Sequence, residues 1–135
     1  MFRQRITIIN ISKPVEKNIN RELQWLATSL GLFNLRDKDR SMFRIFIELL
    51  KSAKINTPIS SDELAYRLNL SRGTVIHHVN KLMESGIVVH YRKRYILRVA
   101  SLKELIVEME KDMIRACENL KDVAKEIDEK LGFRE

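Results

Sequence analysis

The sequence predicts a mainly α-helical protein with one small β-hairpin, an α+β arrangement that ends in a long helix. Three observations predict this fold class. Apolar residues recur at helical spacing along most of the chain, and two short β-prone runs flank Arg92-Lys93-Arg94. The last segment, from Ser101 to Leu131, contains neither Gly nor Pro. The 135 residues have room for one core and an appendage, because single cores typically hold about 100 to 200 residues.

Charge is distributed unevenly along the chain, whose formal net charge is +7. Residues 1–60 carry 11 Lys and Arg against 5 Asp and Glu, residues 61–100 carry 7 against 3, and residues 101–135 carry 7 against 10. A basic excess attracts polyanions such as nucleic acid. We therefore divide the chain into an N-terminal arm and helix (1–36), a basic central domain (37–100) and a C-terminal helix (101–135) with a different role.

The N-terminal part predicts an extended segment followed by helices. Residues 5–11 are β-branched and partly alternating, which predicts a short strand or an arm. Residues 16–32 carry apolar residues at helical spacing and predict a helix. Asp37 or Asp39 can cap a second helix that runs to about residue 53. Because this second helix is apolar nearly all round, we expect it to be the central core helix.

The central part predicts two short helices joined by a tight turn, and then a hairpin. After a turn at residues 57–60, Ser60 or Ser61 can cap the first helix. Ser71 can cap the second helix, which Gly86 terminates. Residues 87–99 then form the hairpin, whose basic tip we expect to hold three residues or more.

Two consecutive runs carry a family resemblance, Ser71-Arg72-Gly73-Thr74-Val75-Ile76-His77-His78-Val79-Asn80-Lys81-Leu82 and Glu84-Ser85-Gly86-Ile87-Val88. They resemble the recognition helix and first wing strand of winged helix-turn-helix regulators of the ArsR and MarR types, and residues 62–70 resemble the positioning helix of those regulators. The resemblance covers about residues 40–100. It implies a winged helix-turn-helix fold and a DNA-binding transcription regulator. A repressor is favoured, because a small domain can block polymerase by occupancy alone.

Helical geometry supports a DNA-reading face on the second short helix. Burial of Val75, Val79 and Leu82 leaves the opposite face free for the major groove, where Arg reads guanine and Asn reads adenine. The basic hairpin tip would reach the minor groove or phosphates, although a solvated loop explains its charge as well. The predicted contacts to double-stranded DNA are Ser71, Arg72, Gly73, Thr74, Ile76, His77, Asn80, Lys81, Arg92, Lys93 and Arg94.

The C-terminal segment predicts one helix of about 30 residues, roughly 45 Å long, with Ser101 as its cap. Its apolar residues alternate spacings of four and three, as in a coiled coil, and indicate a homodimer. The alternative is an amphipathic helix folded back along its own chain. The predicted dimerisation residues are Leu102, Ile106, Met109, Met113, Ala116, Leu120, Val123 and Ile127.

Several function classes are disfavoured by the sequence. It shows no nucleophile with its base, no glycine-rich phosphate loop and no metal-ligand spacing, so we expect no enzyme, cofactor or metal. His77 and His78 diverge by about 100° on a helix and cannot easily share one ion. Cys117 is the only cysteine, which suits a reducing cytoplasm.

No run approaches the roughly 18 apolar residues of a membrane span, so we expect no membrane partner. Two other partner classes stay open at the sequence level. An unknown effector could bind near Trp25 and Phe33, although core packing explains these residues as well. The competing function is a winged-helix module that binds RNA or a protein instead of a specific DNA sequence.

Overall fold

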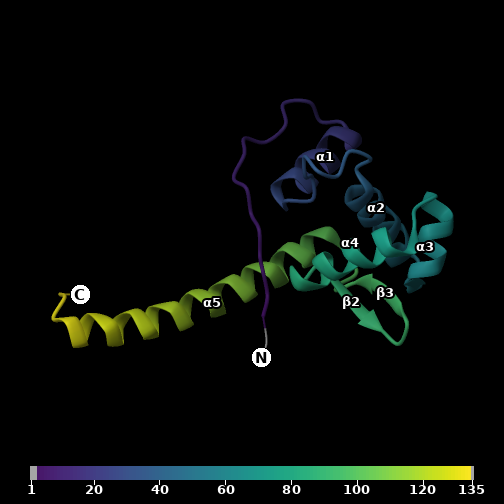
Figure 1. The fold of residues 1–135 in the computed structure, drawn as a ribbon. Coiled ribbons are helices and arrows are strands. Elements are labelled where there is room, and N and C mark those ends of the chain that lie inside the picture. The colour runs from purple at the N-terminus through teal and green to yellow at the C-terminus, as the bar shows by residue number, and fades with distance from the viewer. Residues whose placement is uncertain (1–2, 135) are drawn as a thin grey trace.

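The computed structural model describes residues 3–134, so Met1, Phe2 and Glu135 of the predicted terminal parts lie outside the described residues. The predicted fold class is confirmed: helices dominate, with one small antiparallel sheet and a long C-terminal helix (Figure 1). The elements are α1 (Ile19–Ser29), α2 (Ser41–Lys54), β1 (Ile59–Ser60), α3 (Ser61–Leu68), α4 (Arg72–Glu84), β2 (Val88–Tyr91), β3 (Arg94–Leu97) and α5 (Leu102–Leu131).

Helix α2 is the central core helix, as the sequence predicts. Its residues Ile45, Phe46 and Leu49 are fully buried, and α3 and α4 both pack against it. Val75 and Val79 of α4 are also fully buried, because they recur at the spacing of one helical turn and face α2. This packing fixes the opposite face of α4 toward solvent.

Side-chain oxygens cap the helices at the predicted serines. The Oγ atoms of Ser60, Ser71 and Ser101 each accept a hydrogen bond from the backbone N–H three residues later, at 3.1 to 3.2 Å. Helix α2 begins differently: Arg40 is its N-cap residue, with a positive φ of 54° and no side-chain cap. The Asp37 carboxylate instead accepts from the first N–H groups of that helix, so of the two predicted aspartates Asp37 has the capping role.

The sheet corrects two sequence expectations. Ile59–Ser60 are not part of a turn, because they pair with Tyr95 and Arg94 as the edge strand of a sheet with order β1-β3-β2. The hairpin tip is shorter than predicted, since Tyr91 pairs with Arg94 and only Arg92 and Lys93 form the loop. Arg92 takes a positive φ of 57° there. Glycine and asparagine are the usual residues at such a position, which is why their absence obscured the turn.

The N-terminal segment is an arm, which is one of the two predicted alternatives. It lies across the molecule in an extended conformation (Figure 1). The backbone N–H of Arg5 donates to Glu84 at the end of α4, and that of Ile9 donates to Ser29 at the end of α1. Helix α1 starts only at Ile19, because Asn18 caps it. The arm therefore ties α1 to the far end of α4.

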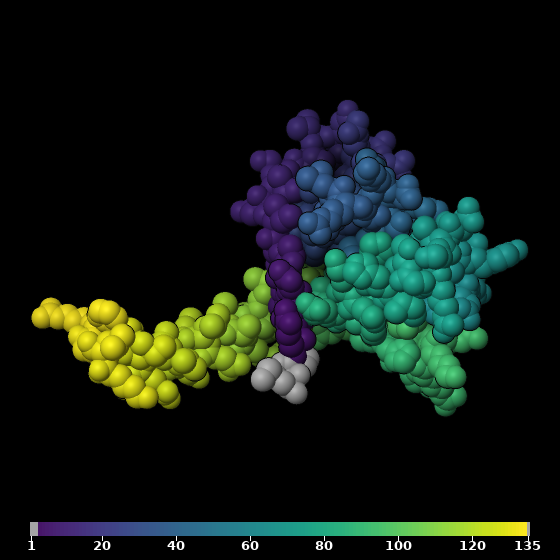
Figure 2. Space-filling view, viewed as in Figure 1, coloured from purple at the N-terminus to yellow at the C-terminus, as the bar shows by residue number. Residues whose placement is uncertain are grey.

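Helix α5 has a packed half and a projecting half. Leu105 and Met109 are almost fully buried against the core, and Asp112 is buried beside them. From Met113 to Arg134 every residue except Asp128 is exposed, and the helix projects away from the body (Figures 1 and 2). Within residues 3–134, no helix has the length and apolar character that a membrane crossing requires.

Candidate nucleic-acid interface

The exposed face of α4 carries the predicted helix contacts. Arg72, Gly73, His77, Asn80 and Lys81 are exposed, as is the capping residue Ser71, while Thr74 and Ile76 are half-buried. The Ser71 cap and the buried valines together fix the rotation of the helix, so this face cannot turn inward. The face combines cationic, amide and small residues, which are groups that bind phosphates and base edges.

Asp62 lies beside the candidate interface, at a position that sequence analysis missed. Its carboxylate lies 3.4 Å from Nε of Arg72, and both side chains are exposed. Asp62 lies on α3 in the run that resembles a positioning helix, so that resemblance was the one available signal. An exposed pair of this kind contributes little to stability, about 0 to 1 kcal/mol. It can nevertheless orient the Arg72 guanidinium while leaving its terminal N–H groups free.

Gly73 lies where an added side chain would have room. A Cβ atom built at this position meets nothing within 4 Å. Packing within the described residues therefore does not require glycine here. The open space suits close approach of another molecule to the start of α4.

The hairpin of β2, β3 and the loop between them, which we call the wing, presents its cations without acidic partners. Arg92, Lys93 and Arg94 are exposed, and none forms an ion pair with any residue from 3 to 134. The Arg92 guanidinium lies 5.5 Å from the centroid of the Tyr91 ring. The hairpin protrudes beside α3 and α4 (Figures 1 and 2). Its charge is therefore available to an anionic partner.

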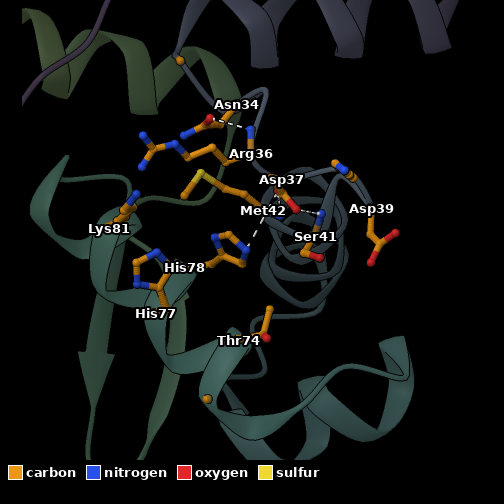
Figure 3. Close-up of a pocket in the computed structure, with 13 residues that line it drawn as sticks. Asn34, Arg36, Asp37, Asp39, Ser41, Met42, Thr74, His77, His78 and Lys81 are labelled. Carbon is orange, nitrogen blue, oxygen red and sulfur yellow. Dashed lines mark hydrogen bonds and ion pairs between the residues drawn. The ribbon is translucent and has the colours of Figure 1, made fainter.

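A groove of about 750 Å³ lies between α4 and the loop that joins α1 to α2 (Figure 3). The loop supplies Asn34 and the charged residues 36–39, and α4 supplies Gly73, Thr74, His77, His78 and Lys81. Among residues 3–134, no three His, Cys, Asp or Glu side chains lie together as a metal site would require.

Buried His78 and half-buried Asp37 face each other in this groove (Figure 3). Nε2 of His78 lies 3.9 Å from Oδ2 of Asp37, and Nδ1 of His78 is buried with no hydrogen-bond partner in the described part of the chain. Burial lowers the pKa of His78 below its ordinary value of 6.5, and the nearby Asp37 offsets this only in part. For Asp37, burial raises the pKa, but the hydrogen bonds from Met42 and Ser41 outweigh burial and leave the pKa lowered.

We expect mild acid to destabilise the protein through His78. The unfolded chain binds a proton at His78 near pH 6.5, but the folded protein binds it only at lower pH, so the free energy of unfolding falls as the pH drops through 6.5. Asp37 adds a further loss below about pH 3.8. Urea titrations between pH 8 and pH 5 should show the first loss. His78→Phe should flatten that profile. His77→Asn removes only one of the neighbouring charges that lower the pKa of His78 and should flatten the profile less. Equal profiles for both variants would contradict the assignment.

The predicted dimerisation residues separate into two groups in the structure. The structure corrects the prediction that Met109 contacts a partner. Its side chain is 1% exposed and belongs to the core of its own chain, because the first turns of α5 pack on the body. Leu102 is half-buried against the same core. The others are exposed, namely Ile106, Met113, Ala116, Leu120, Val123 and Ile127. Val107 and Ile114, which the heptad pattern omits, are exposed apolar residues on a neighbouring face of α5.

The residues of the expected effector region are occupied in packing. Nε1 of Trp25 donates to the backbone oxygen of Ser12 at 2.8 Å, which holds the arm on α1. Phe33 packs against Phe43 with ring centroids 5.0 Å apart, and Arg40 lies over the Phe33 ring. An effector near Trp25 and Phe33 stays a prediction.

Comparison with known proteins agrees with this arrangement. Residues 38–89, from just before α2 into the wing, match the family described as winged helix-turn-helix DNA-binding. No curated protein and no solved structure matches the chain. The fold fits a winged helix, and residues 38–89 are similar to winged helix-turn-helix DNA-binding domains. The match supports the wider resemblance only, and it does not distinguish the ArsR and MarR types from other winged helix-turn-helix proteins.

Proposed function

We propose that the protein is a dimeric, sequence-specific DNA-binding transcription regulator that acts in the cytoplasm, and that it represses. Helix α4 enters the major groove, and the wing contacts the adjacent minor groove or phosphates. One observation carries the proposal: the solvent-facing side of α4 and the protruding wing both present cations and polar groups within a domain that matches a DNA-binding family. A regulator of this size would repress by occupying its site.

Phosphate binding and base reading are assigned to different residues. The cations of the wing and Lys81 of α4 would neutralise phosphates, which gives affinity with little dependence on sequence. Arg72 and Asn80 are exposed on α4 and have the donor geometry for guanine and adenine edges. The preference for one sequence should therefore depend on α4 more than on the wing.

Dimerisation is proposed through the exposed apolar stripe of α5. The projecting half of the helix has no contact surface on its own body, which disfavours the alternative of a helix folded back along its chain. A second copy would cover Leu120, Val123 and Ile127, which are 69%, 55% and 49% exposed. A two-fold dimer presents two copies of α4, so its target should be roughly palindromic, with half-sites about one helical turn apart.

Arg72→Ala is expected to weaken binding to the preferred duplex by about 1 to 3 kcal/mol for each half-site and to relax preference at one position of each half-site. The reason is the loss of two parallel hydrogen bonds to a base edge. A preferred duplex is first selected from a random-sequence pool. Competition binding then compares the variant on matched and mismatched duplexes. Arg21→Ala, which removes an exposed arginine from α1, is the matched control and should leave the preference intact.

Two results would contradict this assignment. An undiminished preference in Arg72→Ala would mean that Arg72 reads no base, and the reading face would have to be assigned to other residues of α4. Wild-type protein that binds RNA or a protein partner but shows no preference among duplexes would favour the competing function of a winged-helix interaction module.

A further inference from the structure

We propose that the loop between α1 and α2 is a third DNA-binding element, in which Arg36 joins Lys81 and His77 of α4 to bind one backbone phosphate. The inference rests on the proposed function for one point only, the placement of α4 in the major groove. It adds a residue that neither the helix-turn-helix pattern nor the family match includes, since the match begins at residue 38.

The α1–α2 loop lines one side of a groove whose other side is α4. Arg36, His77 and Lys81 line the same groove although they come from two separate elements. Figure 3 shows the Arg36 side chain extending toward the side of the groove where Lys81 and His77 lie, whereas Asp39 lies at the other side. Arg36 and Lys81, which both carry a permanent positive charge, thus share one end of the groove. Neither forms an ion pair with a carboxylate of residues 3–134. Such an arrangement suits an anion.

The dimensions of the major groove place a phosphate backbone beside this loop. A helix with its side chains is about 10 to 12 Å across, and the major groove is about 12 Å wide. The two phosphate backbones must therefore run along the flanks of a helix that lies in the groove. The space beside Gly73, His77 and Lys81 is one such flank. A strand that passes there meets the α1–α2 loop.

Hydrogen bonds within the α1–α2 loop hold its backbone in place. The N–H of Arg36 donates to Oδ1 of Asn34, and the N–H of Asp37 donates to the backbone oxygen of Asn34. The Asp37 carboxylate is fixed by its two hydrogen bonds from the start of α2. The Arg36 backbone is thus held on the start of α2, against which α4 packs, before any ligand binds, and this lowers the entropy that binding must offset. Asp37 also lines the groove, and the N–H groups of Ser41 and Met42 partly offset its negative charge.

The test compares Arg36→Ala with Arg21→Ala, which removes one exposed arginine elsewhere, by measuring duplex affinity as a function of salt concentration. We expect Arg36→Ala to lower affinity for matched and mismatched duplexes alike. It should reduce the slope of log K against log salt by about 0.9 for each bound protomer, hence by about 1.8 for the proposed dimer, because each copy loses one phosphate contact. Arg36→Lys should restore most of the slope. Arg21→Ala should leave the slope unchanged. Arg36 is exposed, so thermal melting should show all three variants folded.

A double-variant cycle tests whether Arg36 and Lys81 bind the same phosphate. If they do, Arg36→Ala combined with Lys81→Ala should reduce the slope by less than the two separate reductions added together. Full additivity would overturn the shared site.

Other outcomes separate the inference from the proposed function. Wild-type protein that binds duplex DNA, with Arg36→Ala equal to Arg21→Ala, overturns the loop contact and leaves the proposed function intact. Loss of preference without a change in slope would make Arg36 a base-reading residue and overturn the phosphate assignment. A wild-type protein that binds no duplex overturns both. The site would take free phosphate instead if inorganic phosphate bound in the groove at constant ionic strength while Arg36→Ala left DNA binding unchanged.

Discussion

Leu120→Asp combined with Val123→Asp is expected to convert the proposed dimer into a monomer. These residues lie on one face of α5, one turn apart, and both are more than half exposed on the single chain. In a dimer they would be buried, and a carboxylate buried there without a partner is strongly unfavourable. Sedimentation analysis of wild type and variant measures the change in mass directly. The isolated fold should persist, because neither side chain belongs to the core.

A matched control makes this result specific. Lys121→Ala combined with Lys125→Ala changes the net charge by the same amount in the same segment, but off the apolar stripe, and should remain dimeric. Deletion of the chain after Ala100 would be a poorer test, because it also removes Leu105 and Met109 from the core. A wild-type monomer would refute dimerisation, and a dimeric Leu120→Asp, Val123→Asp variant would place the interface elsewhere.

Asp112→Ala is expected to destabilise the fold by about 3 kcal/mol. The Asp112 side chain is 4% exposed and accepts hydrogen bonds from Arg98, Arg115 and, at 2.8 Å, from Nε2 of Gln4. The hydrogen bond from Arg98 is the main reason that the pKa of Asp112 is lowered. Removing the carboxylate leaves Arg98 partly buried and without this partner, and breaking a buried pair in this way typically costs about 3 to 5 kcal/mol.

The lower end of that range applies because the Arg98 side chain is 25% exposed and keeps some contact with water. The melting temperature should fall by roughly 10 °C. Glu108→Ala removes a more exposed acid one turn earlier on α5, 3.8 Å from Arg98, and should cost less than about 1 kcal/mol. Equal melting temperatures for Asp112→Ala and Glu108→Ala would contradict the role of Asp112 in holding the arm, the wing and α5 together.

Local sequence determined the helices, their caps and the orientation of α4. Ser60, Ser71 and Ser101 cap helices because a hydroxyl oxygen reaches a backbone N–H three residues on, a relation within one turn of the chain. The apolar spacing of Val75 and Val79 likewise determined which face of α4 is buried. The exposure of Arg72 and Asn80 followed from the same helical period.

Only the tertiary structure decided which partners these elements meet. Strand β1 exists because Ile59 and Ser60 lie beside β3, and two residues carry too little pattern to predict pairing. Met109 matches the heptad seam, yet it is buried in its own core, because spacing along a helix does not say which neighbour covers the face. The contacts of Asp112 with Gln4 and Arg98 join residues 108 and 14 positions apart. Contacts over such separations depend on packing of the whole chain, which no local pattern encodes.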